Sequence, residues 1–84
     1  MPGKYSPLEN FLHDIPETQK EVTLTFEQIE RIINDKLPAS AYEYPAWWSN
    51  HRGSHVEADA WLNTGWFVDE VNFHEKWVRF IREQ

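Results

Sequence analysis

The sequence has no cysteine, only three glycines and no long apolar run in its 84 residues. Without cysteine, a disulfide framework and thiolate chemistry are both excluded. No apolar run approaches the roughly 20 residues of a membrane-spanning helix, and the first residues lack the pattern of a signal peptide. We therefore expect a cytoplasmic protein with no membrane partner. The length predicts a single domain over residues 1–84.

Positive charge is also scarce. Eight Lys and Arg residues stand against fourteen Asp and Glu residues, which gives a net charge of −6. Phosphate contacts dominate the affinity of most nucleic-acid-binding proteins, so such proteins are usually basic. An acidic chain slows approach to DNA and favours a basic partner. Even so, Arg52, Lys76, Arg79 and Arg82 all fall after residue 50 and could form a local basic face.

Helix starts are marked by a recurring pattern. In a capping box, a Ser or Thr before a helix and a Glu or Gln three residues later satisfy each other's free backbone N–H groups. The sequence has four such pairs: Ser6 and Glu9, Thr25 and Gln28, Ser40 and Glu43, Ser54 and Glu57. They predict helices over 7–14, over about eight residues after Thr25, over one turn before Pro45, and over 55–63. The apolar positions of the first and last of these helices are Leu8, Phe11, Leu12 and Ile15, and Val56, Ala60, Trp61 and Leu62.

Strands are predicted where apolar and β-branched residues alternate, at 22–25, 66–73 and 77–82. The last two form a hairpin with an irregularity at Asp69-Glu70, and the lone strand 22–25 should pair with it in a three-stranded sheet. For Trp66 and Trp77 we expect a cross-strand aromatic pair or packing of the sheet on the helices. The fold class is α+β. The order helix, strand, helix, helical turn, helix, hairpin is winged-helix-like, with the third main helix as recognition helix and the hairpin as wing.

Several segments resemble a small, uncharacterised family of bacterial and phage domains over roughly residues 5–82. The similarity is carried by the runs 23–30 (TLTFEQIE), 37–41 (LPASA), 47–50 (WWSN) and 60–66 (AWLNTGW). The resemblance implies no activity. Residues Tyr42-Glu43-Tyr44 are more acidic and aromatic than is usual in this family, which weakens the case for nucleic-acid binding.

The polar segment from Ser49 to His55 is the main candidate site. It leads into the predicted third main helix, where free N–H groups and the helix dipole favour phosphate. Arg52 could contact a guanine edge or a phosphate, Asn50 an adenine edge, and Ser49 and Ser54 phosphates. His51 and His55, with Lys76 of the wing, complete this set. The alternative is a solvated loop whose polar side chains bond to their own backbone.

Two tryptophans precede this segment. Either Trp47 and Trp48 both pack in the core, or one ring lies near the surface beside Asn50 and Arg52. An exposed ring would suit base stacking or a partner's pocket.

A metal site and an enzyme are not expected. His51 and His55 are separated by Gly53 and the predicted cap Ser54, and no third ligand follows at a suitable spacing. No acidic residue has an accompanying nucleophile or Gly-rich turn, so we expect neither catalysis nor a cofactor.

Two classes of function therefore remain. The first is a winged-helix module that binds nucleic acid through the third main helix and the wing. The second is a protein-interaction module, or an acidic, inhibitor-like accessory protein of a phage or mobile element, that uses Trp47, Trp48 and the acidic face. The sequence names neither the partner nor the oligomeric state.

Overall fold

The computed structural model describes residues 3–52 and 56–83. The elements are α1 (Ser6–His13), β1 (Glu21–Thr25), α2 (Phe26–Ile33), α3 (Ala39–Glu43), the 3-10 helix η1 (Pro45–Trp48), α4 (Val56–Leu62), β2 (Trp66–Asn72) and β3 (Trp77–Arg82). In this part of the chain the fold is α+β, with four α-helices and one three-stranded antiparallel sheet. The predicted order of elements is confirmed.

The sheet has the order β1-β3-β2, so the strand that precedes α2 joins the hairpin as predicted. The ladder between β2 and β3 shifts register between Val68 and Glu70, which confirms the expected irregularity. Trp66 lies opposite Arg82, whereas Trp77 lies opposite Asn72. A cross-strand tryptophan pair is therefore wrong, because the two rings lie at opposite ends of the hairpin.

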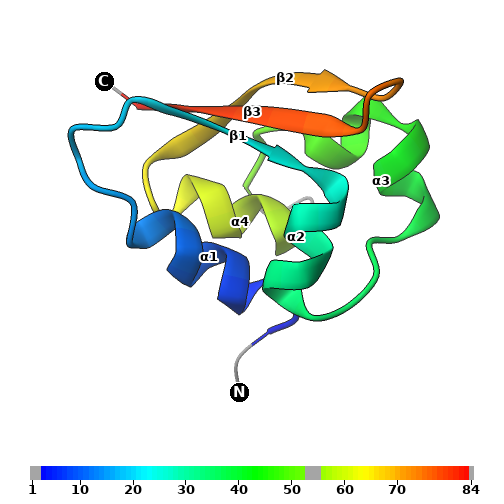
Figure 1. Cartoon of the computed structure of the whole chain (residues 1–84), viewed down its shortest axis with the longest axis horizontal. Helices are drawn as coiled ribbons and strands as arrows, with labels where there is room; N and C mark the ends of the chain where they lie inside the picture. The colour runs from blue at the N-terminus through cyan, green and yellow to red at the C-terminus, as the bar shows by residue number, and fades with distance from the viewer. Residues whose placement is uncertain (1–2, 53–55, 84) are drawn as a thin grey trace.

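The molecule has two layers. Figure 1 shows the sheet over a layer formed by α1, α2 and α4, with α3 at the end near the β2–β3 turn. Within the described chain, the other face of the sheet is not covered by any element. This uncovered side is called the open face below.

The core between the layers is largely aromatic. The ring of Trp48 stacks between Phe26, at 5.2 Å, and Trp61, at 5.9 Å. Phe80 of β3 packs on Trp61 from the sheet side, at 5.5 Å. Trp66 is also buried, and its indole N–H donates to the carbonyl of Leu12 at 3.1 Å, so it packs the sheet on α1. Large rings thus bury enough apolar surface for a short chain.

One of the four predicted capping boxes is confirmed. The Thr25 hydroxyl accepts from the Gln28 N–H, and the Gln28 side chain accepts from the Thr25 N–H. Ser6 and Ser40 do not cap, and both predictions are wrong because the N-cap residues are Tyr5, one residue earlier, and Pro38, two residues earlier. The Ser6 hydroxyl accepts from the Gly3 N–H instead. The fourth box includes Ser54, which lies outside the described residues.

Two predicted core positions are wrong. Phe11 is 39% exposed and Val56 is 74% exposed. On α1 the buried residues are Leu8 and Leu12, which lie one turn apart. On α4 the buried side is rotated relative to the prediction and consists of Glu57, Ala58, Ala60 and Trp61.

Candidate functional site

Trp47 and Trp48 both belong to the core. They are 8% and 2% exposed, and their rings contact each other edge to face at 4.6 Å. The indole N–H of Trp48 donates to the carbonyl of Ala41 at 2.8 Å. Core packing of both rings is confirmed, and the alternative of one ring near the surface is wrong. Two adjacent residues reach the same core because the tight 3-10 turn η1 carries them.

Asn50 uses its whole side-chain amide within the protein. Its Nδ2 donates to the carbonyl of Val68 at 3.0 Å, and its Oδ1 accepts from the N–H of Val68 at 2.9 Å. The same Oδ1 accepts from the indole N–H of Trp61 at 3.0 Å. Asn50 therefore imitates one residue of a neighbouring strand at the outer edge of β2. Base recognition by this amide would require these bonds to break.

Arg52 holds the C-terminal end of α4. Its guanidinium donates to the side-chain oxygen of Asn63 at 2.6 Å and to the carbonyl of Leu62 at 3.1 Å. The carbonyls at the C-terminal end of a helix lack partners inside the helix. A cation at that end also interacts favourably with the negative end of the helix dipole. The structure thus gives Arg52 a local capping role, although its side chain remains exposed.

The remaining candidate residues are dispersed. The Ser49 N–H closes η1 on the carbonyl of Ala46, and His51 is exposed. Ser54 and His55 lie outside the described residues. Lys76 is exposed in the β2–β3 turn, where its carbonyl accepts from the first N–H of α2. It therefore lies at the far end of β2 from Val68, the residue that Asn50 holds.

The open face carries large apolar side chains, although no element of the described chain covers it. Inward residues of β3 are fully buried, so the alternate residues Trp77, Arg79 and Ile81 point to the open face. All three are half-buried, and β1 contributes exposed polar residues beside them. From β2, Phe67 lies directly opposite Ile81. An apolar pair and a tryptophan thus occupy the uncovered side of the central strand.

An ion-pair cluster separates these two apolar areas. Arg79 bonds to the carboxylate of Asp69 at 2.9 Å and to that of Glu70 at 2.7 Å. The hydrogen bond with Asp69 raises the pKa of Arg79 above its ordinary value. The guanidinium also lies over the ring of Trp77, with 5.8 Å between its carbon and the ring centre. The bulge at 69 places two successive carboxylates where a regular strand would place only one.

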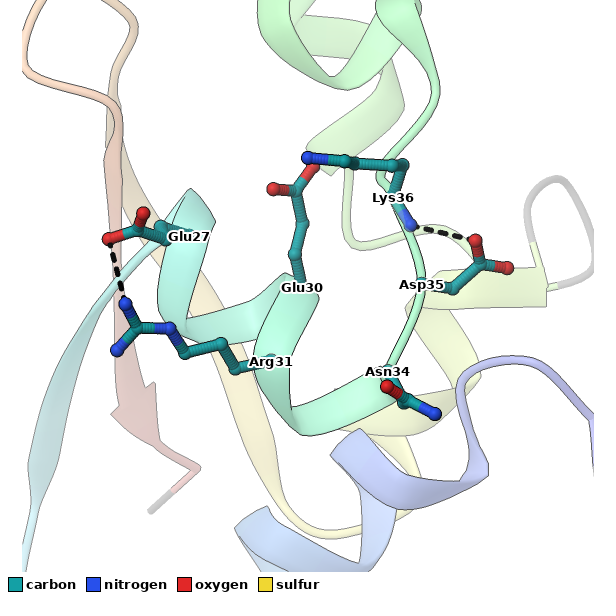
Figure 2. A pocket seen from close by; sticks show the side chains of 6 residues that line it. All are labelled: Glu27, Glu30, Arg31, Asn34, Asp35 and Lys36. Carbon is teal, nitrogen blue, oxygen red and sulfur yellow. Dashed lines mark hydrogen bonds and ion pairs between the residues drawn. The ribbon is translucent and has the colours of Figure 1, made fainter.

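A second feature is an open hollow of about 430 Å³ beside α2 (Figure 2). Its carboxylates and Arg31 have local partners. Glu27 pairs with Arg31 at 3.6 Å, and Asp35 accepts from the backbone N–H of Lys36. Glu30 accepts from the hydroxyl of Tyr42 and from a backbone N–H. This hollow is best explained as a solvated helix face.

The described residues contain no group of three or more potential metal ligands. Nor does any helix in that part of the chain have both the length and the apolar character needed to span a membrane.

The family described as a domain of unknown function (DUF7662) matches residues 5–83. The chain belongs to this family. No curated protein and no solved structure matches it.

Sequence reasoning did not single out the open face. The signal was present in the run 77–82, because both sets of alternate residues in it contain large apolar side chains. A strand covered on one side only should be polar at its outward positions. Trp77 and Ile81 depart from this pattern, and this departure makes the open face the candidate contact surface.

Proposed function

We propose that this DUF7662 domain is a non-enzymatic module that binds a protein partner through the open face of its sheet. The observation that carries the proposal is the outward column Trp77, Arg79 and Ile81 on β3, with Phe67 beside it. Trp and Arg are the residue types most enriched at the energetic centres of protein interfaces. An apolar surface crossed by a charged cluster is typical of such interfaces.

The test is site-specific photo-crosslinking in cells of the natural source. A photo-reactive amino acid replaces Thr23, which is exposed on the open face beside Arg79. In the control chain it replaces the exposed Asn10 of α1. We expect one defined protein adduct from position 23 that survives nuclease treatment and disappears in the Ile81→Lys background. Equal adducts from both positions, or no adduct from position 23, would contradict the proposal.

A second candidate function is nucleic-acid binding by a winged-helix-like domain, with α4 as recognition helix and the β2–β3 turn as wing. The order of elements and the sheet order β1-β3-β2 favour it. Its weakness is α4 itself, which carries Glu57 and Asp59 in its first turn and no basic residue in its last. Further, the open face lies on the side of the sheet away from α4 (Figure 1).

The two functions differ in their dependence on salt. Affinity for duplex DNA should fall by roughly one log unit per log unit of salt for each phosphate contacted. A fluorescence titration at low and moderate salt measures this slope directly. Lys76→Ala should reduce the slope if the turn contacts phosphate, since the Lys76 side chain is exposed and the contact of this residue with α2 is made by its backbone carbonyl. An absence of binding at low salt would eliminate this candidate.

A further inference from the structure

We infer that the partner segment that binds the open face is a basic amphipathic helix. This inference rests on the proposed function and specifies the chemistry of the partner. Three features of the described residues support it: the capped edges of the sheet, the spacing of the apolar areas on the open face, and the charge around them.

The edges of the sheet are poor templates for an added strand. Lys20 and Phe26 make backbone hydrogen bonds to the β3 side of β1. Because successive residues of a strand bond to alternate sides, the backbone groups of residues 21, 23 and 25 point away from β3, to the free edge of the sheet. The side chain of Gln19 donates to the carbonyl of Glu21, and the side chain of Gln28 accepts from the N–H of Thr25. Only Thr23 lies between these two capped positions.

The other edge is capped in the same way. Asn50 bonds to both the N–H and the carbonyl of Val68, and the bulge at Asp69 bends the strand directly after it. Bulges and covered backbone groups are the means by which proteins discourage strand addition. A partner is therefore expected to pack on the open face of the sheet rather than to extend its edge. A helix packed on one face of a sheet is one of the standard layered arrangements of proteins.

The apolar areas have the spacing of helix anchors. Ile81 and Trp77 are four residues apart on one strand, which corresponds to about 13 Å at about 3.3 Å per residue. Residues i and i+7 of a helix are about 10.5 Å apart along its axis and lie on nearly the same face, so two such side chains can reach both areas. One apolar anchor would contact Ile81 and Phe67, and the next would contact Trp77. The Arg79 cluster would lie beneath the turn between them.

The charge on the open face favours basic flanks. Glu21, Asp69 and Glu70 point to this side and Arg79 provides the only basic charge among the strand residues there, so the local net charge is negative. A second copy of the chain would bring the same negative surface and a net charge of −6, so self-association is disfavoured. Lys or Arg residues on the partner would complement these carboxylates.

The test uses a designed 18-residue peptide with Leu along one helix face, Lys on both flanks and Ala elsewhere. The control peptide has Glu in place of every Lys. Binding is measured by the anisotropy of the labelled peptide and by acrylamide quenching of the Trp77 emission, taken as the difference from Trp77→Phe. Trp77 reports on the open face because the other four tryptophans are buried.

We expect saturable binding of the basic peptide, protection of Trp77 from acrylamide and at least tenfold weaker binding of the acidic peptide. Ile81→Lys should weaken the basic peptide roughly tenfold or more, since it removes an apolar anchor and adds like charge. The control Phe11→Lys makes a similar apolar-to-Lys change at an exposed position of α1. It should weaken binding of the basic peptide only by the small amount that follows from the change in net charge.

A smaller effect is expected from charge reversal alone. Glu21→Lys should weaken binding of the basic peptide roughly 2–5-fold, because an exposed ion pair contributes little to affinity. Glu43→Lys, which changes the net charge equally at an exposed position of α3, provides the matched control.

Three results would overturn the inference: equal binding of both peptides, binding of neither, or equal effects of Ile81→Lys and Phe11→Lys. If Thr23 still crosslinks to a protein in these cases, the partner occupies the open face in another form and the proposed function stands. If the crosslink is also absent, the proposed function fails too. Mapping of the crosslinked segment gives an independent check, because an acidic or extended segment would contradict the inference.

Discussion

The two sides of β3 use similar residue types for different purposes. On the inner side, Val78 and Phe80 are fully buried against the helices. On the outer side, Trp77 and Ile81 are half-buried and flank an arginine held by two carboxylates. The inner residues are accounted for by folding. The outer ones are not, since a Thr or Lys would satisfy an uncovered sheet face equally well.

The comparison separates stability from recognition within a single strand. Replacing a core residue should lower the free energy of unfolding whether or not a partner is bound. Residues that exist for a partner should be replaceable at low cost to folding. Four predictions follow in order of decreasing expected effect on stability, and the first and the last of them compare the two sides of β3.

The largest effect is expected from Trp61→Ala. Trp61 is fully buried, stacks on Trp48 and contacts Phe80. Its removal should lower the free energy of unfolding by roughly 3–5 kcal/mol, through lost burial and an uncollapsed cavity. The matched change Trp77→Ala on the outer side should cost only about 1 kcal/mol, as a half-exposed substitution does. Urea denaturation of both variants measures the difference.

Equal costs for these two substitutions would mean that the outer tryptophan is a structural residue, and the distinction between the two sides of β3 would fail. If the alanine variant of Trp61 does not fold at all, Trp61→Phe provides a milder measure of the same site.

The second prediction concerns Asn50→Ala. This change breaks both bonds to Val68 and leaves the buried indole N–H of Trp61 without an acceptor. Unsatisfied buried donors cost about 1–3 kcal/mol, so a loss of about 2 kcal/mol is expected. The neighbouring control His51→Ala changes an exposed side chain and should leave the unfolding midpoint unchanged. A stable Asn50→Ala variant would return Asn50 to the list of free binding groups.

Much of the fold was predictable because local signals agreed with the tertiary packing. The cap at Thr25, the strand 77–82 and the irregularity at Asp69-Glu70 each follow from a few adjacent residues. The helix starts at Ser6 and Ser40 were wrong for a local reason as well. The capping pattern identifies a helix start only if no upstream residue starts the helix first, and here Tyr5 and Pro38 already occupy the N-cap positions.

The candidate site was less predictable. Asn50 and Arg52 have the chemistry of nucleic-acid contacts, but their partners, Val68 and Leu62, lie 18 and 10 residues further along the chain. No local pattern reveals a side-chain bond of that kind. The open face was hidden for the opposite reason, because half-buried apolar residues in a strand look the same whether a helix or an absent partner covers them.

The third prediction tests a polar contact on the helical side. The Tyr42 hydroxyl donates to Glu30 at 2.9 Å. Burial is the largest cause and this hydrogen bond the second largest cause that raises the pKa of Tyr42 to about 12. Because the folded state holds this proton more tightly, its stabilising effect is complete below pH 10 and is lost as the pH rises towards about 12. Tyr42→Phe should cost about 1 kcal/mol at neutral pH and flatten the alkaline fall in stability. Denaturation at several pH values measures both effects, and an unchanged alkaline profile would show that another group controls it.

The smallest effect on stability is expected from Ile81→Thr. Its side chain is half-buried and lies opposite Phe67 on the open face, and the neighbouring strand β1 already carries outward Thr residues there. Thr has a β-branched side chain that suits a strand, so the free energy of unfolding should change by no more than about 0.5 kcal/mol. If the outer side of β3 serves a partner, this nearly silent change should still abolish the crosslink from Thr23. Denaturation of the purified variant and crosslinking of the same variant in cells decide the matter together. A large loss of stability would assign Ile81 to the core, whereas an intact crosslink in a stable variant would show that the partner does not bind at Ile81.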